Sequence, residues 1–306
     1  MINTYPKVAI LMPTYNGSKF INSQIISILN QSNIEPTIFL YDDYSCDNTL
    51  AIARSFKSVI SKNISDLPSI SEKKSAAISF YRIINGINLP AHFQYIALSD
   101  QDDIWFSNKL VKAINLLSKN KFSGYSSSVL AFWKNGSNQY IKKSGFSSPE
   151  NALFESAGPG CTYVLKREVF ELFRLFLKKN MSTFEKIDFH DWAIYAFVTN
   201  AGFEWYIDSS PSMYYRQHKN NSFGASSSLK QKIKRFNMIK EGWYFYQVYL
   251  LHKLYKPNFI LISGSKFKLF KRAYLFFSLL KLRRRLFDKI SLAILSLFCE
   301  LPVKGK

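Results

Sequence analysis

The chain has 306 residues, of which 47% are hydrophobic and 20% are charged. This composition excludes a chain that is disordered in bulk and supplies enough apolar side chains for one large domain, or for a domain with an appendage. The formal net charge of +20 is placed unevenly, because residues 226–306 carry 18 Lys and Arg but only three acids. Such asymmetry requires an acidic partner surface, and nucleic acid and an anionic membrane face are the two candidates.

Cysteine usage and hydropathy restrict the compartment. Cys46, Cys161 and Cys299 are odd in number and far apart, so they predict neither a zinc site nor a disulfide framework, and a reducing compartment such as the cytosol is favoured. The apolar run Val8–Met12 is too short for the core of a signal peptide. No run of 18 uncharged apolar residues is present, so we expect no membrane-spanning segment.

The chain begins with a strand, a helix and a second strand. Val8–Met12 has the pattern of a short buried strand, and the polar residues 13–17 predict a tight loop. Apolar residues at helical spacing predict a helix over 20–29, with Ser18 as its cap. Pro36 then precedes a strand over 37–41. This alternation favours a sheet with parallel strands.

The second strand is followed directly by two acids, Asp42 and Asp43. Ser45 or Asp47 could cap a helix that starts at Thr49, which would explain this loop structurally. A second strand end of the same kind makes a binding site the better interpretation, because the carboxyl ends of parallel strands meet at one edge of the sheet.

That second strand end is the most informative part of the sequence. After a helix over 76–84, the apolar run 95–98 ends in Ser99 and three acids within four positions, Asp100, Asp102 and Asp103. Side by side, three carboxylates repel one another unless a cation compensates them. A hard ion such as Mg²⁺ or Mn²⁺ would do so and leave positions open for phosphates. The alternative is an acidic turn that caps the helix starting near Ser107.

The second half of the chain continues with alternating elements. We expect helices over 110–117 and 168–177, strands over 129–133, 163–165 and 205–208, and a surface excursion that ends at Pro149. A sharp turn at Gly158, Pro159, Gly160 and Cys161 either reverses the chain or lets the backbone approach a ligand closely.

Two further polar positions are candidates for a site. Asp191, between His190 and Trp192, opens an apolar helix through Val198 and is either an N-cap or a general base beside an aromatic platform. His218 follows a strand pattern and is either a surface histidine or a metal ligand.

Taken in order, these motifs resemble the family-2 glycosyltransferases with the GT-A fold, in particular the rhamnosyltransferase-like branch that builds bacterial surface polysaccharides. The resemblance covers roughly residues 5 to 225. It is carried by six segments, which are Pro13-Thr14-Tyr15-Asn16-Gly17, Asp42-Asp43, Ser99-Asp100-Gln101-Asp102-Asp103-Ile104-Trp105, Gly158-Pro159-Gly160-Cys161, His190-Asp191-Trp192 and Tyr215-Arg216-Gln217-His218.

The resemblance implies a fold and a reaction. The fold would be a GT-A (Rossmann-like) α/β domain with a mostly parallel central sheet flanked by helices. The reaction would be an inverting, metal-dependent transfer of a sugar from a nucleoside diphosphate to an acceptor hydroxyl. Rhamnose from dTDP-rhamnose is the leading donor, and a UDP-hexose is the alternative. The acceptor would be a growing glycan on a polyprenyl diphosphate.

The resemblance also implies roles for individual residues. Asp191 would be the catalytic base, and Asp43 would accept the imide N–H of a uracil or thymine ring. Asp102 and His218 would hold Mn²⁺ or Mg²⁺, which neutralises the leaving diphosphate. The remaining nucleotide-binding residues would be Pro13, Thr14, Tyr15, Asn16, Asp42 and Asp100. The sugar and acceptor pocket would be lined by Trp105, Gly158, Pro159, Gly160, Cys161, His190 and Trp192.

The basic C-terminal region is interpreted from its own residues. We expect a catalytic domain over 1–225 and a helical extension over 226–306, in which Lys and Arg alternate with long apolar side chains. Amphipathic helices of this kind bind the interface of an anionic membrane, which favours a peripheral location on the inner face of the cytoplasmic membrane. The alternative is a helical subdomain packed on the core. A nucleic-acid partner is not expected, because no reader motif is present.

Overall fold

The computed structural model describes residues 5–71, 73–143, 145, 147–218, 237–238, 241–255, 284, 289–290 and 293–294. The elements of the first half are, in chain order, β1 (Lys7–Thr14), α1 (Ile21–Leu29), β2 (Glu35–Asp42), α2 (Thr49–Arg54), β3 (Val59–Asn63), the 3-10 turn η1 (Ile64–Asp66), α3 (Ala76–Gly86), β4 (Tyr95–Leu98) and β5 (Ile104–Trp105).

The second half begins with α4 and ends with a long helix. Its elements are α4 (Lys109–Lys119), β6 (Phe122–Trp133), β7 (Asn138–Ile141), α5 (Pro149–Ala152), the 3-10 turn η2 (Gly160–Thr162), β8 (Val164–Lys166), α6 (Arg167–Lys179), α7 (Met181–Phe184), α8 (His190–Asn200), β9 (Glu204–Gln217) and α10 (Trp243–Tyr255).

One sheet runs through the described part of the chain, in the order β3-β2-β1-β4-β8-β6-β9-β5, with β7 paired to β6. Strands β3, β2, β1 and β4 are all parallel, which confirms the parallel arrangement expected for the first half. The second half is mixed. Strand β8 runs antiparallel to both β4 and β6, and β6 and β9 are parallel to each other.

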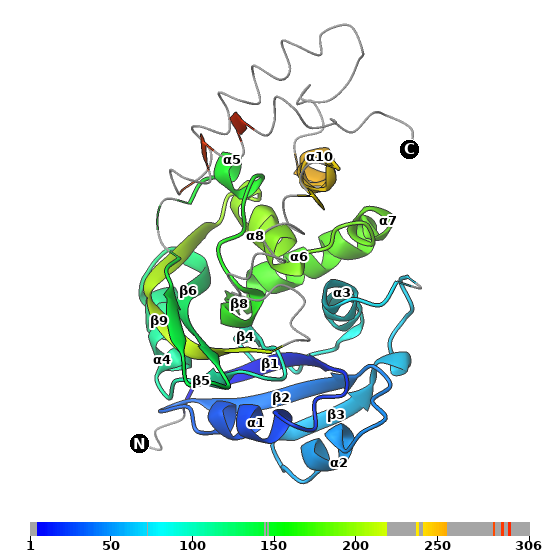
Figure 1. The fold of residues 1–306 in the computed structure, drawn as a ribbon, viewed down its shortest axis with the longest axis vertical. Coiled ribbons are helices and arrows are strands. Elements are labelled where there is room, and N and C mark those ends of the chain that lie inside the picture. The colour runs from blue at the N-terminus through cyan, green and yellow to red at the C-terminus, as the bar shows by residue number, and fades with distance from the viewer. Residues whose placement is uncertain are drawn as a thin grey trace, which may run out of the picture.

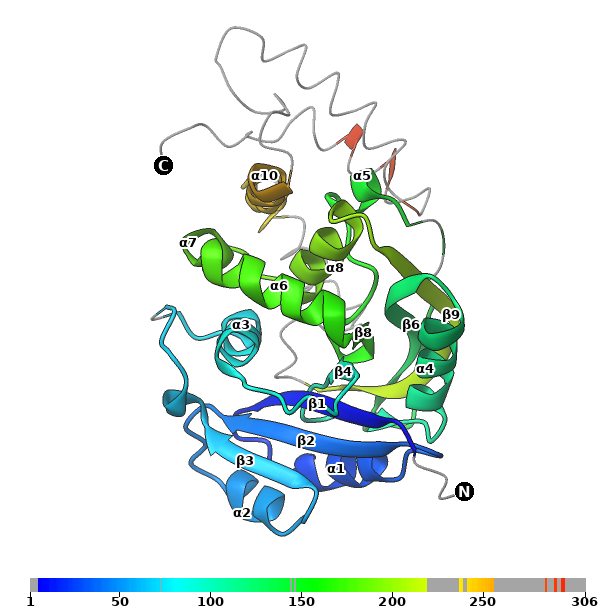
Figure 2. The same cartoon turned by 180° about the vertical axis from the view of Figure 1, so that it is seen from behind.

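The strands are continuous apolar runs because helices cover both faces of the sheet. Along β1, Ala9 and Leu11 belong to one apolar cluster, and Val8, Ile10 and Met12 belong to another. Helices α3, α6, α8 and α10 pack on the first face, and α1, α2 and α4 pack on the second. Figures 1 and 2 show α3 and α6 on the side of the sheet opposite to α1 and α2.

The end of β9 returns the chain to the first half of the sheet. Strand β9 starts in parallel with β6 and ends antiparallel to β5, where Ile104 pairs with Tyr214. The β6–β9 pair contains register shifts, which bend a long strand pair. Through this bend, β9 delivers residues 216–218 to the loop that follows β4 (Figure 1).

Most expected elements are confirmed, but one cap is wrong. Helix α1 starts at Ile21 after Phe20, and no side chain caps it. Ser18 instead donates its backbone N–H to the carboxylate of Asp47, at 3.1 Å. The same carboxylate accepts the N–H of Thr49 at the start of α2. Asp47 therefore links the residues before α1 to the start of α2. Local sequence patterns do not predict such a tertiary contact.

The described part of the C-terminal region is packed on the core. In α10, Tyr244, Phe245, Val248 and Leu251 are buried in the cluster that contains α8. The Tyr244 hydroxyl donates to the carbonyl of Phe154 at 2.6 Å. The expected basic amphipathic segment over 266–285 lies outside the described residues except for Arg284. Among the helices that the structure describes, none is long and apolar enough to cross a membrane.

Candidate active site

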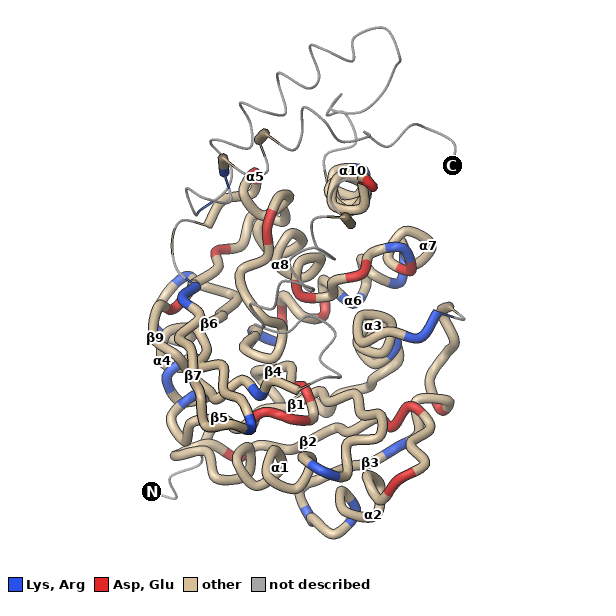
Figure 3. Tube along the Cα trace, viewed as in Figure 1, with Lys and Arg blue, Asp and Glu red and all other residues tan. Residues whose placement is uncertain are grey.

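The acid loop, residues 99–103, connects β4 to β5. Asp103 is fully buried, and Asp100 and Asp102 are partly exposed. Figure 3 shows this acidic stretch next to β1 and β5, at the edge of the sheet. The short apolar strand Tyr95–Leu98 carries the loop out of the core. The acids are therefore placed at the carboxyl end of the parallel unit, where ligands bind in open α/β sheets.

Burial and the repulsion between neighbouring carboxylates raise the pKa values of two acids in this loop. Burial, followed by the charge of Asp102, raises the pKa of Asp100 to about 7. Burial, followed by the charges of Asp102 and Asp100, raises the pKa of Asp103 well above its usual range. The second oxygen of Asp103 has no hydrogen-bond partner among the described residues. Asp100 and Asp103 therefore cannot both be ionised in this position without a compensating positive charge.

The end of β9 clamps the acid loop from one side. The backbone N–H of Arg216 donates to the carboxylate of Asp103 at 3.0 Å, and its guanidinium Nε donates to the carbonyl of Asp102 at 2.7 Å. The Arg216 guanidinium lies 4.7 Å from the ring centroids of both Phe20 and Phe132. Cation–π contacts on both sides fix the guanidinium in this position.

His218 and Asp102, both expected as metal ligands, are in contact. Nε2 of His218 lies 2.6 Å from an Asp102 oxygen, and the side chains are 23% and 14% exposed. The His218 ring also stacks on Phe20 at 5.1 Å. A carboxylate and an imidazole that are accessible and adjacent form half of a site that suits Mn²⁺ or Mg²⁺.

A second group in the described part of the chain also has metal-ligand spacing. Its atoms, from Asp100, Asp103 and Cys161, lie within 4.8 Å of one another. Burial raises the pKa of the Cys161 thiol well above its usual range, and sulfur is a soft ligand, whereas Mg²⁺ and Mn²⁺ prefer oxygen. The residues that fit a hard divalent ion are therefore Asp102 and His218, with Asp100 beside them.

Asp191 lies in the first turn of α8. The helix starts at His190 after Phe189, so Asp191 is not its N-cap, and its carboxylate accepts the N–H of Trp192 at 2.7 Å. Burial raises the pKa of Asp191 to about 6, although hydrogen bonds from Trp192 and Ser156 act in the opposite direction. The charge of Asp191 also contributes to the raised pKa of Asp100. The Cβ of Asp191 lies against Gly160, and the sulfur of the adjacent Cys161 lies within 4.8 Å of carboxylate oxygens of Asp100 and Asp103.

The glycine turn, residues 158–162, contacts the start of α8. A side chain at Gly160 would place its Cβ 2.4 Å from Nε2 of His190 and 3.2 Å from Cβ of Asp191. Only glycine therefore permits this approach. Gly158 adopts φ of +145°, a region that side chains rarely occupy. Two motifs separated by about thirty positions in the sequence meet at this point.

His190 is enclosed and neutral. Its ring stacks on Phe80 with centroids 3.9 Å apart, and burial lowers its pKa to about 3. Its Nε2 is buried and has no hydrogen-bond partner within the part of the chain that the structure describes. With this low pKa, His190 is uncharged at neutral pH and only a weak base, so it does not compete with Asp191 as the general base.

The two expected tryptophans lie in the core. Trp192 is 5% exposed, donates its indole N–H to the carbonyl of Ala152 at 2.8 Å and stacks on Tyr244. Trp105 is 3% exposed and belongs to the cluster on the opposite face of the sheet. Trp192 therefore anchors α8 behind Asp191, and Trp105 anchors the acid loop.

The two acids that follow β2, Asp42 and Asp43, lie in different environments. Asp42 is 1% exposed, and its carboxylate accepts three hydrogen bonds, from the Thr14 hydroxyl and from the N–H and hydroxyl of Ser45. Those donors satisfy its charge without a ligand. Asp42 fixes the loop and directs Asp43 toward a pocket.

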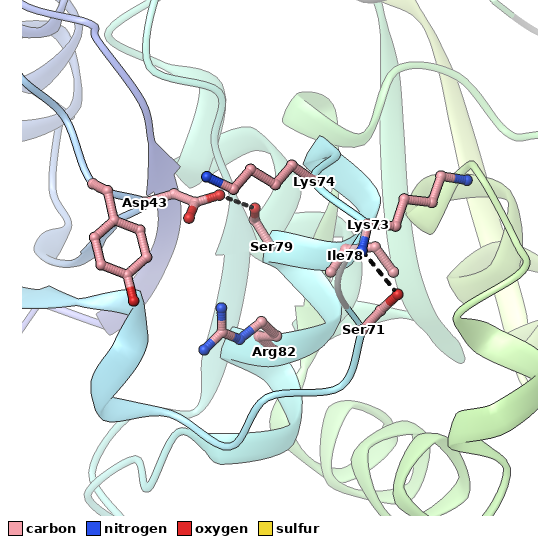
Figure 4. A pocket seen from close by; sticks show the side chains of 8 residues that line it. Asp43, Ser71, Lys73, Lys74, Ile78, Ser79 and Arg82 are labelled. Carbon is pink, nitrogen blue, oxygen red and sulfur yellow. Dashed lines mark hydrogen bonds between the residues drawn. The ribbon is translucent and has the colours of Figure 1, made fainter.

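Asp43 lines a cavity of about 170 Å³ between the end of β2 and α3. The wall is formed by Asp43, Tyr44, Ser71, Lys73, Lys74, Ile78, Ser79 and Arg82. Figure 4 shows Lys74 and Ser79 directed toward Asp43, whose carboxylate accepts a 3.4 Å hydrogen bond from Ser79. This cavity combines one acceptor with basic side chains, which suits a nucleotide.

The loop after β1 is held by Gln101 of the acid loop. The amide of Gln101 accepts from the N–H of Tyr15 at 2.9 Å and donates to the carbonyl of Tyr15 at 3.0 Å. Asn16, at φ of +46°, accepts the N–H of Cys46. Pro13 and Thr14 end β1, and the Tyr15 side chain is 57% exposed. The three loops that follow β1, β2 and β4 therefore form one connected wall.

Sequence reasoning missed several residues that organise this site. Ser156 carries no motif of its own, and Gln101 was part of the quoted Ser99–Trp105 motif without an assigned role. Arg216 was part of a motif without an assigned role, although a basic residue two positions before a candidate metal ligand was a usable signal. Lys109 was also missed. A lysine at the first position of α4, directly before apolar residues, is a sequence signal for a charged group on the buried face of that helix.

Several known proteins are similar to this chain. A family model described as Glycosyl transferase family 2 matches residues 9–179, a range that contains β1 to α6 and the acid loop. The chain belongs to glycosyl transferase family 2. It is 38% identical over 285 residues to the dTDP-rhamnosyl transferase RfbG of Shigella flexneri, covering 93% of this chain and 98% of that protein.

The name of a second, less similar relative includes a different donor. The chain is 28% identical over 173 residues to the UDP-Glc:alpha-D-GlcNAc-diphosphoundecaprenol beta-1,3-glucosyltransferase WfgD of Escherichia coli, covering 54% of this chain and 62% of that protein.

Solved structures confirm the GT-A fold. TarS 1-349 of S. aureus in complex with UDP is 14% identical, with a TM-score of 0.50 and coverage of 95% of this chain and 88% of that chain. The mannosyltransferase PcManGT of Pyrobaculum calidifontis in complex with GDP-Man and Mn2+ is 12% identical, with a TM-score of 0.50 and coverage of 96% and 86%. The family-2 membership and the GT-A fold expected from the motifs are thus confirmed.

Proposed function

We propose that this family-2 glycosyltransferase inverts the anomeric centre as it transfers rhamnose from dTDP-rhamnose to a hydroxyl of a growing bacterial surface glycan. The observation that supports this proposal is the position of Asp191, which lies against Gly160, while the adjacent Cys161 lies within 4.8 Å of the Asp100 and Asp103 carboxylates. An inverting transfer needs a base for the acceptor hydroxyl and positive charge that stabilises the leaving diphosphate.

In the proposed mechanism, Asp191 removes the proton of the acceptor hydroxyl as that oxygen attacks the anomeric carbon. Inversion places the attacking oxygen and the diphosphate on opposite faces of the sugar. The Asp191 carboxylate is held by the N–H of Trp192, so its orientation is fixed before the acceptor binds. When bound at Asp102 and His218, a divalent ion would neutralise charge on the leaving diphosphate.

The donor would bind along the wall formed by the three loops. Asp43 in its cavity would accept the imide N–H of the pyrimidine, with the Pro13–Asn16 loop beside it. Asp100 would contact the ribose, and the glycine turn would line the sugar pocket with His190. The donor dTDP-rhamnose is supported by the name of the S. flexneri relative. A UDP-hexose is the second candidate, supported by the name of the E. coli relative.

We further propose a lipid-linked acceptor and a cytoplasmic enzyme that attaches peripherally to the inner face of the membrane. The name of the E. coli relative includes a diphosphoundecaprenol acceptor, and residues 226–306 carry 18 basic residues. A test is binding to anionic vesicles of a chain shortened after Tyr255, which retains α10 and the core. Binding as strong as that of the full chain would contradict a role for the basic region.

The proposed function is tested by the variant Asp191→Asn. We expect kcat for rhamnosyl transfer from dTDP-rhamnose to fall by about 10²- to 10⁴-fold, the usual contribution of a general base. Calorimetry should show dTDP binding within about twofold of wild type, because Asp191 acts on the acceptor. Glu168→Gln is the matched control, since Glu168 lies in the first turn of α6 and is exposed. Near wild-type turnover of Asp191→Asn would contradict the base assignment.

A further inference from the structure

Lys109, at the start of α4, is a fully buried lysine. Its residue is 0% exposed, whereas lysines are almost never fully buried unless they are paired. Its ammonium lies 3.2 Å from the centroid of the Trp105 ring and donates to the carbonyl of Cys161 at 2.6 Å. Lys109 therefore connects two parts of the site, because Trp105 follows the acid loop and Cys161 belongs to the glycine turn.

The charges around Lys109 come from the same two segments. Burial lowers the pKa of Lys109 to about 7, and Cys161, Asp103 and Asp100 act in the opposite direction. Met213 of β9 is the other neighbour, with its sulfur 3.9 Å from the ammonium. From the end of β9, the guanidinium of Arg216 donates to the backbone carbonyl of Asp102, and its backbone N–H donates to the carboxylate of Asp103. Lys109 is thus a fully buried basic group that lies between the residue following the acid loop and the glycine turn.

We propose that Lys109 is a positioning residue, which joins the acid loop to the glycine turn and holds Asp100 and Asp103 in place so that Asp102 faces the metal and nucleotide. This inference rests on the proposed function for its consequence in binding. Its structural part, the link between the two segments, does not depend on the ligand. Neighbours that orient metal ligands commonly change metal affinity or activity by about 10- to 100-fold when they are replaced.

A purely structural role predicts the opposite result. Replacing a buried ionic group by an apolar side chain of similar volume is often neutral or stabilising. Lys109→Met keeps the length and apolar stem of the side chain but removes the charge and the donor. If Lys109 only filled space, this variant would be as stable and as active as wild type. If Lys109 positions the loop, the variant stays folded while ligand binding weakens.

The experiment compares Lys109→Met with Lys112→Met in the full chain. Lys112 lies on the same helix, is 40% exposed and pairs with Asp208 at 2.7 Å, away from the acid loop. Calorimetry with dTDP and Mn²⁺ should show about 10- to 100-fold weaker binding for Lys109→Met and near wild-type binding for Lys112→Met. Hydrogen exchange should become faster at residues 99–103 and 158–162 in Lys109→Met alone.

The outcomes separate this inference from the proposed function. Binding within twofold of wild type, with unchanged exchange, would overturn the positioning role. If wild type bound no nucleoside diphosphate, the proposed function would fail, and faster exchange in Lys109→Met would still support the link. Should Lys109→Met not fold, Lys109→Gln retains polarity at the site without charge. Wild-type binding and exchange in Lys109→Gln would likewise overturn the proposal.

Discussion

The ends of β2 and β4 carry similar acids, but their environments differ. Asp42, after β2, is buried and receives three hydrogen bonds from Thr14 and Ser45. Asp103, after β4, is equally buried, but one of its oxygens has no partner among the described residues. Its pKa is raised well above the usual range by burial and by Asp102 and Asp100.

The difference shows how to distinguish an acid that stabilises a loop from an acid that binds a ligand. Donors fixed by the backbone can satisfy a buried carboxylate completely, and such an acid then stabilises the loop. A buried carboxylate that its neighbours repel, and that keeps one oxygen without a hydrogen-bond partner, favours a nearby cation instead. By this criterion Asp42 at the end of β2 is a structural acid, and the end of β4 is where we propose the cation site.

The largest expected effect that tests this comparison is the loss of Asp102. In Asp102→Ala, Mn²⁺-dependent binding of dTDP should fall by at least about 100-fold, because charge stabilisation by a metal is worth several kcal/mol and each 1.36 kcal/mol is tenfold. Calorimetry with and without Mn²⁺ measures this. Glu204→Ala removes a surface carboxyl on β9 paired with Lys121 and should bind as wild type. Metal-dependent binding that survives in Asp102→Ala would place the cation elsewhere.

The next effect belongs to the other strand end. Asp42→Asn should lower the free energy of unfolding by about 2 kcal/mol, since an amide N–H₂ would face the N–H or hydroxyl of Ser45 and hydrogen bonds to a charged acceptor are worth about 1.5–3 kcal/mol. Denaturant unfolding measures it. The dependence of dTDP binding on Mn²⁺ should be unchanged. A variant that kept its stability but lost metal dependence would reverse the comparison.

As the pH falls, the rate of transfer should decrease before the protein unfolds. Because Asp191 must be ionised to accept a proton and burial raises its pKa to about 6, kcat/KM should rise with pH through about 6. It should fall about tenfold for each unit below that value. A pH–rate profile between pH 5 and 8, with circular dichroism at each pH, tests this. A rate that is flat across pH 6 in a folded enzyme would contradict the prediction.

The smallest effect is expected at the nucleotide cavity. Asp43→Ala removes one acceptor from a partly exposed wall, so dTDP binding should weaken by about tenfold or less, which corresponds to one hydrogen bond. The free energy of unfolding should change by less than about 0.5 kcal/mol. Comparison with Asp42→Asn, measured by the same two methods, would show whether adjacent acids divide stability and binding between them. Equal losses of stability would contradict that division.

The sequence predicted the elements that depend on local pattern. The strands over 8–12, 37–41 and 95–98 and the helix over 20–29 are found because continuous apolar runs and helical spacing are local signals. The strand over 129–133 was too short, because β6 starts at Phe122 and its serines are buried in the sheet. Polar residues in a covered strand have no signature in hydropathy.

The site was predicted in composition and only partly in geometry. The contact between Asp102 and His218 agrees with the motif reading. Trp105 and Trp192 lie in the core and not in the expected pocket. A tryptophan next to an acid gives the same sequence pattern whether it lines a pocket or packs in the core. The roles of Gln101, Lys109 and Arg216 depend on contacts between segments 52 to 114 positions apart, which no local pattern contains.

The distance along the chain between Asp102 and His218 has a consequence for folding. These side chains lie 116 positions apart, and the β6–β9 pair must form before the end of β9 can reach the acid loop. Contacts of long sequence separation form late because loop closure costs entropy first. During synthesis the acid loop emerges well before its partners. On refolding, the parallel unit β1–β4 should acquire its structure early, and the capacity to bind a nucleoside diphosphate should return later than the helical signal.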